Sequence, residues 1–221
     1  MPILVPKQRM DAARARVSSY RNILYVPRWA VPDVERAVRE GLRDCAEHLS
    51  ARSDSFSLPA WRKWSRMMTD TRNAKGWPRV FAGGDGVEGA LLSLWEGVQP
   101  VGMDGGNLRD LFADGLDEAA ALLGEPELRP LAGEFRRVHG LWHGLAEAAP
   151  PGERLRELTA AVRESLLSEG TADAADAREL WKLRAAADKE PRTVDFADLG
   201  ARLDAIYLAE SAAIARLREI V

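Results

Sequence analysis

Apolar residues recur at three- and four-residue spacing along most of the chain, which is the pattern of amphipathic helices. The pattern predicts helices over residues 9–17, 33–50, 58–68, 87–98, 108–123, 127–149, 152–167, 172–189 and 196–220. Strand signals are nearly absent, and one short extended run is expected at 23–26. We therefore expect an all-α protein, a compact bundle of about eight to nine helices.

The adjacent prolines Pro150 and Pro151 mark the clearest internal boundary. They predict a helical domain over 1–149 and a helical-hairpin extension over 150–221, packed on the first part. The last helix carries an apolar seam, formed by Leu199, Leu203, Ile206, Ala213, Leu217 and Ile220. This seam packs either inside the chain or on a second copy in a homodimer, and the pattern favours neither alternative.

Charge and cysteine content exclude several classes of protein. The chain has 31 basic and 34 acidic side chains, so no strong field attracts a nucleic acid or a membrane surface, and we expect neither partner. The single cysteine, Cys45, cannot form an internal disulfide, which fits a reducing compartment. The first residues are apolar too briefly for a signal peptide, so we expect a cytoplasmic protein.

A glycine-rich turn before the 108–123 helix is the first candidate site. Asn107 is a good N-cap, Gly105 and Gly106 allow close approach of a ligand, and Arg109 adds a permanent cation. Together they predict a substrate-binding pocket for an anionic group. The alternative is structural: Asn107 only caps the helix, and Arg109 pairs with a carboxylate.

Two carboxylates farther along the same helix are the catalytic candidates. Asp117 and Glu118 are followed by apolar residues, so we expect at least one of them to be buried and hydrogen-bonded. In a cleft, Glu118 would act as a general base for an attacking amine. The alternative is a buried ion pair between helices. Arg109 lies about 12 to 14 Å away along the helix axis, too far to be the partner of either.

Loop and aromatic residues extend the predicted site. Trp77 follows a glycine in the loop over 70–86 and is a candidate for lining the mouth of the pocket that Arg109 borders, with core packing as the alternative. We place it and its neighbour Lys75 among the substrate-binding residues. Five tryptophans are expected to cluster, namely Trp61, Trp64, Trp77, Trp95 and Trp142.

Histidine and cysteine chemistry is a weaker alternative. His139 and His143 have the i, i+4 spacing of metal ligands, but a pair at the surface beside Trp142 explains them better. Cys45 lies on the apolar stripe of its helix, where a cysteine usually packs as a small apolar side chain. Its activation by His48, three residues later, is the catalytic alternative.

Several motifs together resemble a known family over residues 12–149. They are the turn Lys75-Gly76-Trp77-Pro78, the turn Gly105-Gly106-Asn107-Leu108-Arg109, the triplet Asp117-Glu118-Ala119, and Trp142. With their spacing, this region resembles the helical C-terminal domain of the butirosin biosynthesis protein H-like family. In that family the domain follows a papain-like domain with a nucleophilic cysteine, and the named member transfers an acyl group from an acyl carrier protein to an aminoglycoside amine.

The resemblance implies a role in natural-product (antibiotic) biosynthesis, with an acyl or aminoacyl intermediate as substrate. An acyltransferase-like reaction from a carrier protein to an amine is one expectation. The chain is expected to lack the papain-like domain, so the alternative is a non-catalytic binding or assembly partner of a separate cysteine-dependent enzyme subunit. We expect no cofactor of its own, with the phosphopantetheine of a carrier protein as a candidate substrate arm.

We predict that the purified protein contains no stoichiometric transition metal. His139 and His143 alone would form an open, weak site, because a stable one needs further ligands. Elemental analysis measures this directly. One zinc or iron ion per chain would contradict the prediction.

Overall fold

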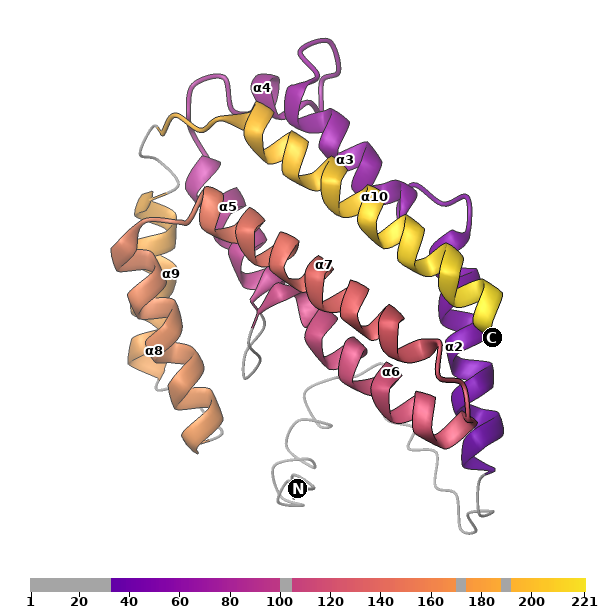
Figure 1. Cartoon of the computed structure of the whole chain (residues 1–221). Helices are drawn as coiled ribbons and strands as arrows, with labels where there is room; N and C mark the ends of the chain where they lie inside the picture. The colour runs from indigo at the N-terminus through magenta and orange to yellow at the C-terminus, as the bar shows by residue number, and fades with distance from the viewer. Residues whose placement is uncertain (1–32, 100–104, 170–173, 188–191) are drawn as a thin grey trace, which may run out of the picture. The chain divides into compact units, whose positions relative to one another are not determined.

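The computed structural model describes residues 33–99, 105–169, 174–187 and 192–221. Within these ranges the chain forms nine α-helices, one 3-10 turn and no strand (Figure 1), so the expected all-α fold is confirmed. The elements are α2 (Val34–Ser50), α3 (Pro59–Thr69), α4 (Trp77–Val80), α5 (Val87–Val98), the turn η1 (Gly106–Leu108), α6 (Arg109–Leu123), α7 (Leu128–Ala148), α8 (Glu153–Glu169), α9 (Ala174–Ala187) and α10 (Phe196–Ile220). The helix expected over 9–17 and the extended run at 23–26 lie outside the described residues.

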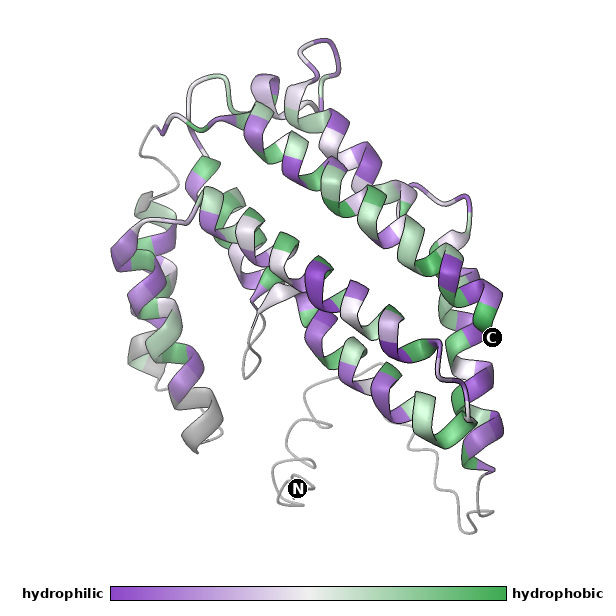
Figure 2. Cartoon of the chain, viewed as in Figure 1, coloured by the Kyte–Doolittle hydropathy of each residue, from purple (hydrophilic) through white to green (hydrophobic). Residues whose placement is uncertain are grey.

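Residues 34–221 form one compact unit, in which α7 and α10 pack against each other. Helix α10 also packs on α3 and α2, and α7 packs on α6. Hydrophobic and hydrophilic residues alternate along these helices (Figure 2), as amphipathic packing requires. The apolar seam of α10 is buried inside the chain at Leu199, Leu203, Ile206, Ala213 and Leu217. Internal packing therefore accounts for the seam, and a homodimer through the C-terminal helix stays a prediction.

The hydrophobic core has two parts that share α7 and α10. One part lies among α2, α6, α7 and the C-terminal half of α10, with Leu116, Leu131 and Ile214 fully buried. The other lies among α3, α5, α7 and the N-terminal half of α10, with Met68 and Leu91 fully buried. None of the helices in the described part of the chain has the length and hydropathy that crossing a bilayer requires.

Helices α3 and α6 both begin without a side-chain N-cap. Helix α6 begins at Arg109, and its N-cap residue is Leu108, which has a left-handed backbone (φ 62°) and no side-chain cap. Asn107 is also left-handed (φ 56°), so its side chain does not cap the helix as expected. Ser57 does not cap α3 either, because its hydroxyl bonds to the loop before the helix, at the backbone of Ala51 and Ser53.

The loop between α3 and α4 is built on Asp70 and Gly76. The Asp70 carboxylate accepts hydrogen bonds from the backbone N–H groups of Arg72 and Asn73. Gly76 then passes so close to the Asp70 carbonyl that a Cβ at this position would lie 1.8 Å from its oxygen. Only glycine therefore fits at this position of the turn before Trp77.

We predict that Gly76→Ala lowers the free energy of unfolding by about 1 to 3 kcal/mol, because the backbone of the loop must move to accept the methyl group. Chemical denaturation measures the change. Gly41→Ala is the matched control, since Gly41 is a helical residue with nothing within 4 Å of the added Cβ. Equal free energies of unfolding for Gly76→Ala and Gly41→Ala would contradict the close packing of Gly76 against Asp70.

Candidate functional site

One carboxylate, that of Glu210 on α10, is almost completely buried, with 1% of its surface exposed. Its Oε1 accepts hydrogen bonds from Arg109 Nε at 2.6 Å and from Trp142 Nε1 at 2.8 Å, and its Oε2 accepts one from Trp61 Nε1 at 3.1 Å. The three donors belong to α6, α7 and α3. Because a buried carboxylate needs its charge and lone pairs satisfied, this cluster holds four helices in one arrangement.

Arg109 connects this cluster to the turn before α6. Its Nη1 donates to the carbonyl oxygen of Asn107 at 3.1 Å, in addition to the ion pair with Glu210. A guanidinium group has five N–H groups, so three remain without a partner among the described residues. The side chain is 20% exposed, which leaves these donors within reach of a ligand.

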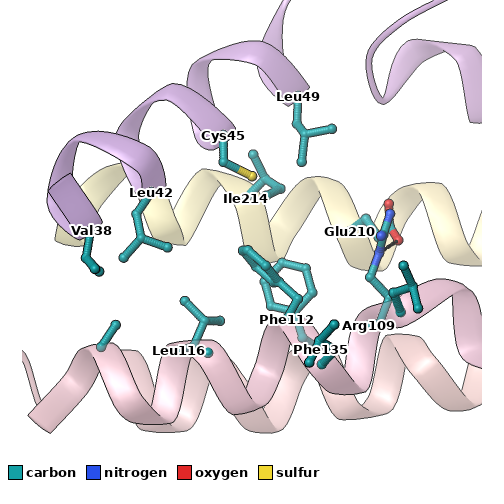
Figure 3. A pocket seen from close by; sticks show the side chains of 14 residues that line it. Val38, Leu42, Cys45, Leu49, Arg109, Phe112, Leu116, Phe135, Glu210 and Ile214 are labelled. Atoms are coloured by element: carbon teal, nitrogen blue, oxygen red, sulfur yellow. Dashed lines mark hydrogen bonds and ion pairs between the residues drawn. The ribbon is translucent and has the colours of Figure 1, made fainter. Parts of the chain in front are cut away.

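A cavity of about 440 Å³ opens beside Arg109, between α2, α6, α7 and α10. Its walls are mostly aliphatic and aromatic, and they consist of Val38, Leu42, Cys45, Leu49, Leu108, Arg109, Leu111, Phe112, Gly115, Leu116, Ala119, Phe135, Glu210 and Ile214. Figure 3 shows Arg109 and Glu210 together at one end and Val38 and Leu42 toward the other. The cavity is therefore apolar along its length, with a charged pair at one end.

Cys45 is the thiol on the cavity wall. Burial raises the pKa of the Cys45 thiol above its ordinary value, and the charge of Arg109 offsets this only in part. The thiol is therefore protonated at neutral pH. His48 is exposed, and no hydrogen bond joins it to Cys45 among the described residues. The arrangement is that of an apolar cysteine rather than of an activated nucleophile.

The glycine turn that was expected to bind an anion packs against α7 instead of lining the cavity. A Cβ on Gly106 would lie 2.0 Å from Nδ1 of His139, and one on Gly105 would lie 3.7 Å from Nδ1 of His143. Both glycines also have positive φ angles, at 60° and 83°. The turn thus places Arg109 at the cavity, and a direct role of Gly105, Gly106 and Asn107 in substrate binding stays a prediction.

The two candidate catalytic carboxylates are not buried, so that expectation is wrong. Asp117 is 39% exposed and pairs with Arg136 of α7 at 2.7 Å, while Glu118 is exposed. Neither lines the cavity, because it opens onto the face of α6 that carries Phe112 and Leu116. Their catalytic roles stay predictions that this geometry does not support.

The loop residues Trp77 and Lys75 also lie outside the cavity lining. Lys75 is exposed, and Trp77 packs its ring against Phe81 and Phe196, at 5.1 and 5.7 Å between ring centres. The expected position of Trp77 at the pocket mouth is therefore wrong, and core packing explains this residue. The aromatic rings on the cavity wall are Phe112 and Phe135, which come from helices.

Four of the five tryptophans expected to cluster form a continuous row. Ring centres are 5.1 Å apart for Trp142 and Trp61, 6.3 Å for Trp61 and Trp64, and 6.3 Å for Trp64 and Trp77. The fifth, Trp95, stacks under Arg163 at 4.9 Å. The row begins at Glu210, because Trp142 and Trp61 donate to it.

The two helical histidines have different environments. His143 is exposed, whereas His139 is half-buried with its Nδ1 3.6 Å from Oδ1 of Asp110. Trp142 between them is buried. Within the described ranges no group of three or more His, Cys, Asp or Glu side chains is arranged to hold a metal ion.

Sequence reasoning missed Glu210, the residue on which the site depends. A signal was present, because Glu210 lies four residues after Ile206 and three before Ala213, in register with the apolar seam of α10. A carboxylate at a seam position must be buried with donors around it. The spacing does not identify those donors, which lie 68 to 149 positions away along the chain.

These features define an all-α protein with an apolar cavity and an arginine–glutamate pair at one end. Residues 8–169 match the family described as a domain of unknown function, DUF4872. Since the match covers most of the 221 residues, the chain belongs to this family. No curated protein and no solved structure matches the chain.

We predict that Glu210→Gln lowers the free energy of unfolding by about 3 to 5 kcal/mol, because it leaves the largely buried Arg109 without its counter-charge. The N–H groups of the glutamine amide would also face Arg109, Trp61 and Trp142, which donate hydrogen bonds and cannot accept them. Glu118→Gln makes the same chemical change at an exposed residue of α6 and should change stability by less than about 0.5 kcal/mol. Denaturant titration of both variants tests this, and equal losses would contradict the central role of Glu210.

Proposed function

We propose that this protein handles an acyl or aminoacyl intermediate of specialised-metabolite biosynthesis and holds the acyl chain in the cavity between α2, α6, α7 and α10. The observation that carries the proposal is an apolar cavity with accessible guanidinium donors at one end. Its volume of about 440 Å³ lies within the range of small-molecule sites. Apolar walls suit a hydrocarbon chain, and the donors suit the oxygen at its head.

The charge at the cavity end favours an uncharged head group. Glu210 already neutralises Arg109, so a free carboxylate entering the cavity would lose its hydration without gaining an unpaired cation. The carbonyl oxygen of an ester, thioester or amide needs only a hydrogen bond, which the remaining N–H groups of Arg109 supply. An acyl group in covalent linkage therefore fits the cavity better than the free acid.

Resemblance to the butirosin biosynthesis protein H-like family supports a setting in natural-product biosynthesis, and the single cysteine is what favours the cytoplasm. It also supports acyl transfer from a carrier protein to an amine as the reaction in which the acyl group takes part. For a transfer carried out by this chain, Glu118 and Asp117 are the catalytic candidates that the sequence offers. Both residues are at least partly exposed and neither lines the cavity, so the structure adds no support for catalysis by them.

The second candidate is a non-catalytic partner that binds the acyl group for a separate cysteine-dependent enzyme subunit. The chemistry of the cavity wall favours it. Burial raises the pKa of Cys45, so this thiol is a poor nucleophile at neutral pH. The Glu210 carboxylate is occupied by three donors, so it has little capacity to act as a base. The cavity thus has the features of a binding site.

We predict that acyl ligands protect Cys45 from alkylation by N-ethylmaleimide. Cys45 is the only cysteine of the chain and lies on the cavity wall, so its labelling rate reports occupancy of the cavity. For N-methyl amides of linear fatty acids, affinity should rise about fourfold with each added methylene until the chain fills the cavity, because each contributes about 0.8 kcal/mol. Mass spectrometry of the labelled protein measures the rate.

Gly115→Leu tests whether the acyl ligand binds in this cavity. Gly115 lines the cavity and an added Cβ meets nothing within 4 Å, so a leucine there fills the cavity without disturbing the helix. Ligands should no longer protect Cys45 in this variant. Gly140→Leu makes the same change on α7 outside the cavity lining, and protection should persist. Failure of every chain length to protect the wild-type thiol would refute the proposal.

A further inference from the structure

A second polar cluster lies among α5, α8 and α9, and none of its residues lines the acyl cavity. Arg163 of α8 and Arg184 of α9 both approach Glu96 of α5, with N–O distances of 4.0 and 3.9 Å. These distances are too long for hydrogen bonds. Two guanidinium groups therefore share one carboxylate, and neither bonds to it directly.

Arg163 is held mainly by neutral groups. Its Nη1 donates to the carbonyl oxygen of Gln99 at 2.7 Å, and its guanidinium carbon lies 4.9 Å from the centre of the Trp95 ring. The side chain is only 16% exposed. Burial lowers the pKa of Arg163, and the charge of Glu96 offsets this only in part. A cation taken out of water with so little compensation attracts an anion.

Arg184 approaches the same place from α9. Its Nη2 donates to the hydroxyl oxygen of Ser93 at 3.0 Å, one turn before Glu96 on α5. The side chain is 28% exposed, so its other N–H groups are accessible from solvent. The nearby carboxylate of Glu147 accepts a hydrogen bond from the Gln99 side chain at 3.3 Å. Glu96 thus remains the one carboxylate paired with these two arginines among the described residues.

A third arginine, Arg156, lies along the same border between helices. The Gly152 N–H donates to Glu88 and Arg163 donates to Gln99, and both contacts join residues 64 positions apart. The segment from Gly152 through α8 therefore runs beside α5 in the same direction. Arg156 is two turns before Arg163 on this face, and its Nε is buried without a hydrogen-bond partner among the described residues.

We propose that Arg163 and Arg184, with Arg156 beside them, form a binding site for the phosphate group of a small molecule. Arg163 and Arg184 share Glu96 as their one paired carboxylate among the described residues, which leaves an excess of positive charge between them that a phosphate group would neutralise. Its tetrahedral oxygens accept hydrogen bonds from arginines on two different helices at once, as a planar carboxylate cannot do as readily. This site is separate from the acyl cavity and does not depend on the function proposed for it.

Calorimetric titration with inorganic phosphate at constant ionic strength tests the site. Arg163→Gln and Arg184→Gln should each weaken binding by about tenfold or more, since each removes charge-assisted hydrogen bonds. Arg154→Gln and Arg178→Gln are the matched controls, because they remove the same charge from exposed residues of α8 and α9 and should leave affinity unchanged. Equal weakening by all four variants would indicate general attraction between charges and would overturn the proposal.

Glu96→Gln is a variant that should strengthen phosphate binding instead of weakening it. Removing the shared carboxylate increases the excess positive charge, so phosphate should bind several-fold tighter to this variant. A merely structural role of Glu96 predicts no such gain, and unchanged or weaker binding would overturn the proposal. Chloride at the same ionic strength should not compete.

Two probes distinguish the sources of the phosphate group. Tighter binding of methyl phosphate than of dimethyl phosphate would assign the site to a free phosphate monoester. The reverse order would assign it to a phosphodiester, such as a phosphopantetheine arm attached to a carrier protein. Binding of neither probe, nor of inorganic phosphate, would overturn the proposal.

Discussion

The burial of one carboxylate is the constraint on which the arrangement of helices depends. Glu210 is removed from water, so α10 takes its position only where α3, α6 and α7 supply donors to both oxygens. Apolar packing alone would tolerate small sliding of these helices, because it is not directional. Three hydrogen bonds to one group are directional, and they fix the axial position of each helix relative to its neighbours.

The same interaction explains why a cavity can exist beside the core. Arg109 is held at both Nε and Nη1, so it stays extended across the end of the cavity instead of folding into it. Helix α2 covers the other side with half-buried side chains, Val38, Leu42 and Leu49, rather than with a fully packed face. A rigid polar end and a loosely packed apolar wall together leave room for a flexible chain.

How far the sequence predicts this structure depends on how local each feature is. The bounds of α5 and α10 match the apolar periodicity, because helix formation is decided within a few residues. Arg109 was singled out correctly as a residue of the cavity wall, whereas the exposure of Glu118 was not foreseen. Which face of α6 is covered depends on α2 and α7, and the sequence of α6 holds no information about them. Glu210 shows the same limit, since its donors are distant in sequence.

The distances in sequence within the Glu210 cluster have a consequence for the order of folding. Trp61, Arg109 and Trp142 precede Glu210 by 149, 101 and 68 positions. Until α10 docks, the Arg109 guanidinium and both indole N–H groups have to remain hydrated, so α3, α6 and α7 cannot close on one another completely. The non-local contacts that complete the core therefore form together and late, which makes docking of α10 the expected slow step of folding. During synthesis, the earlier helices would wait in a loosely associated state for the helix that joins them.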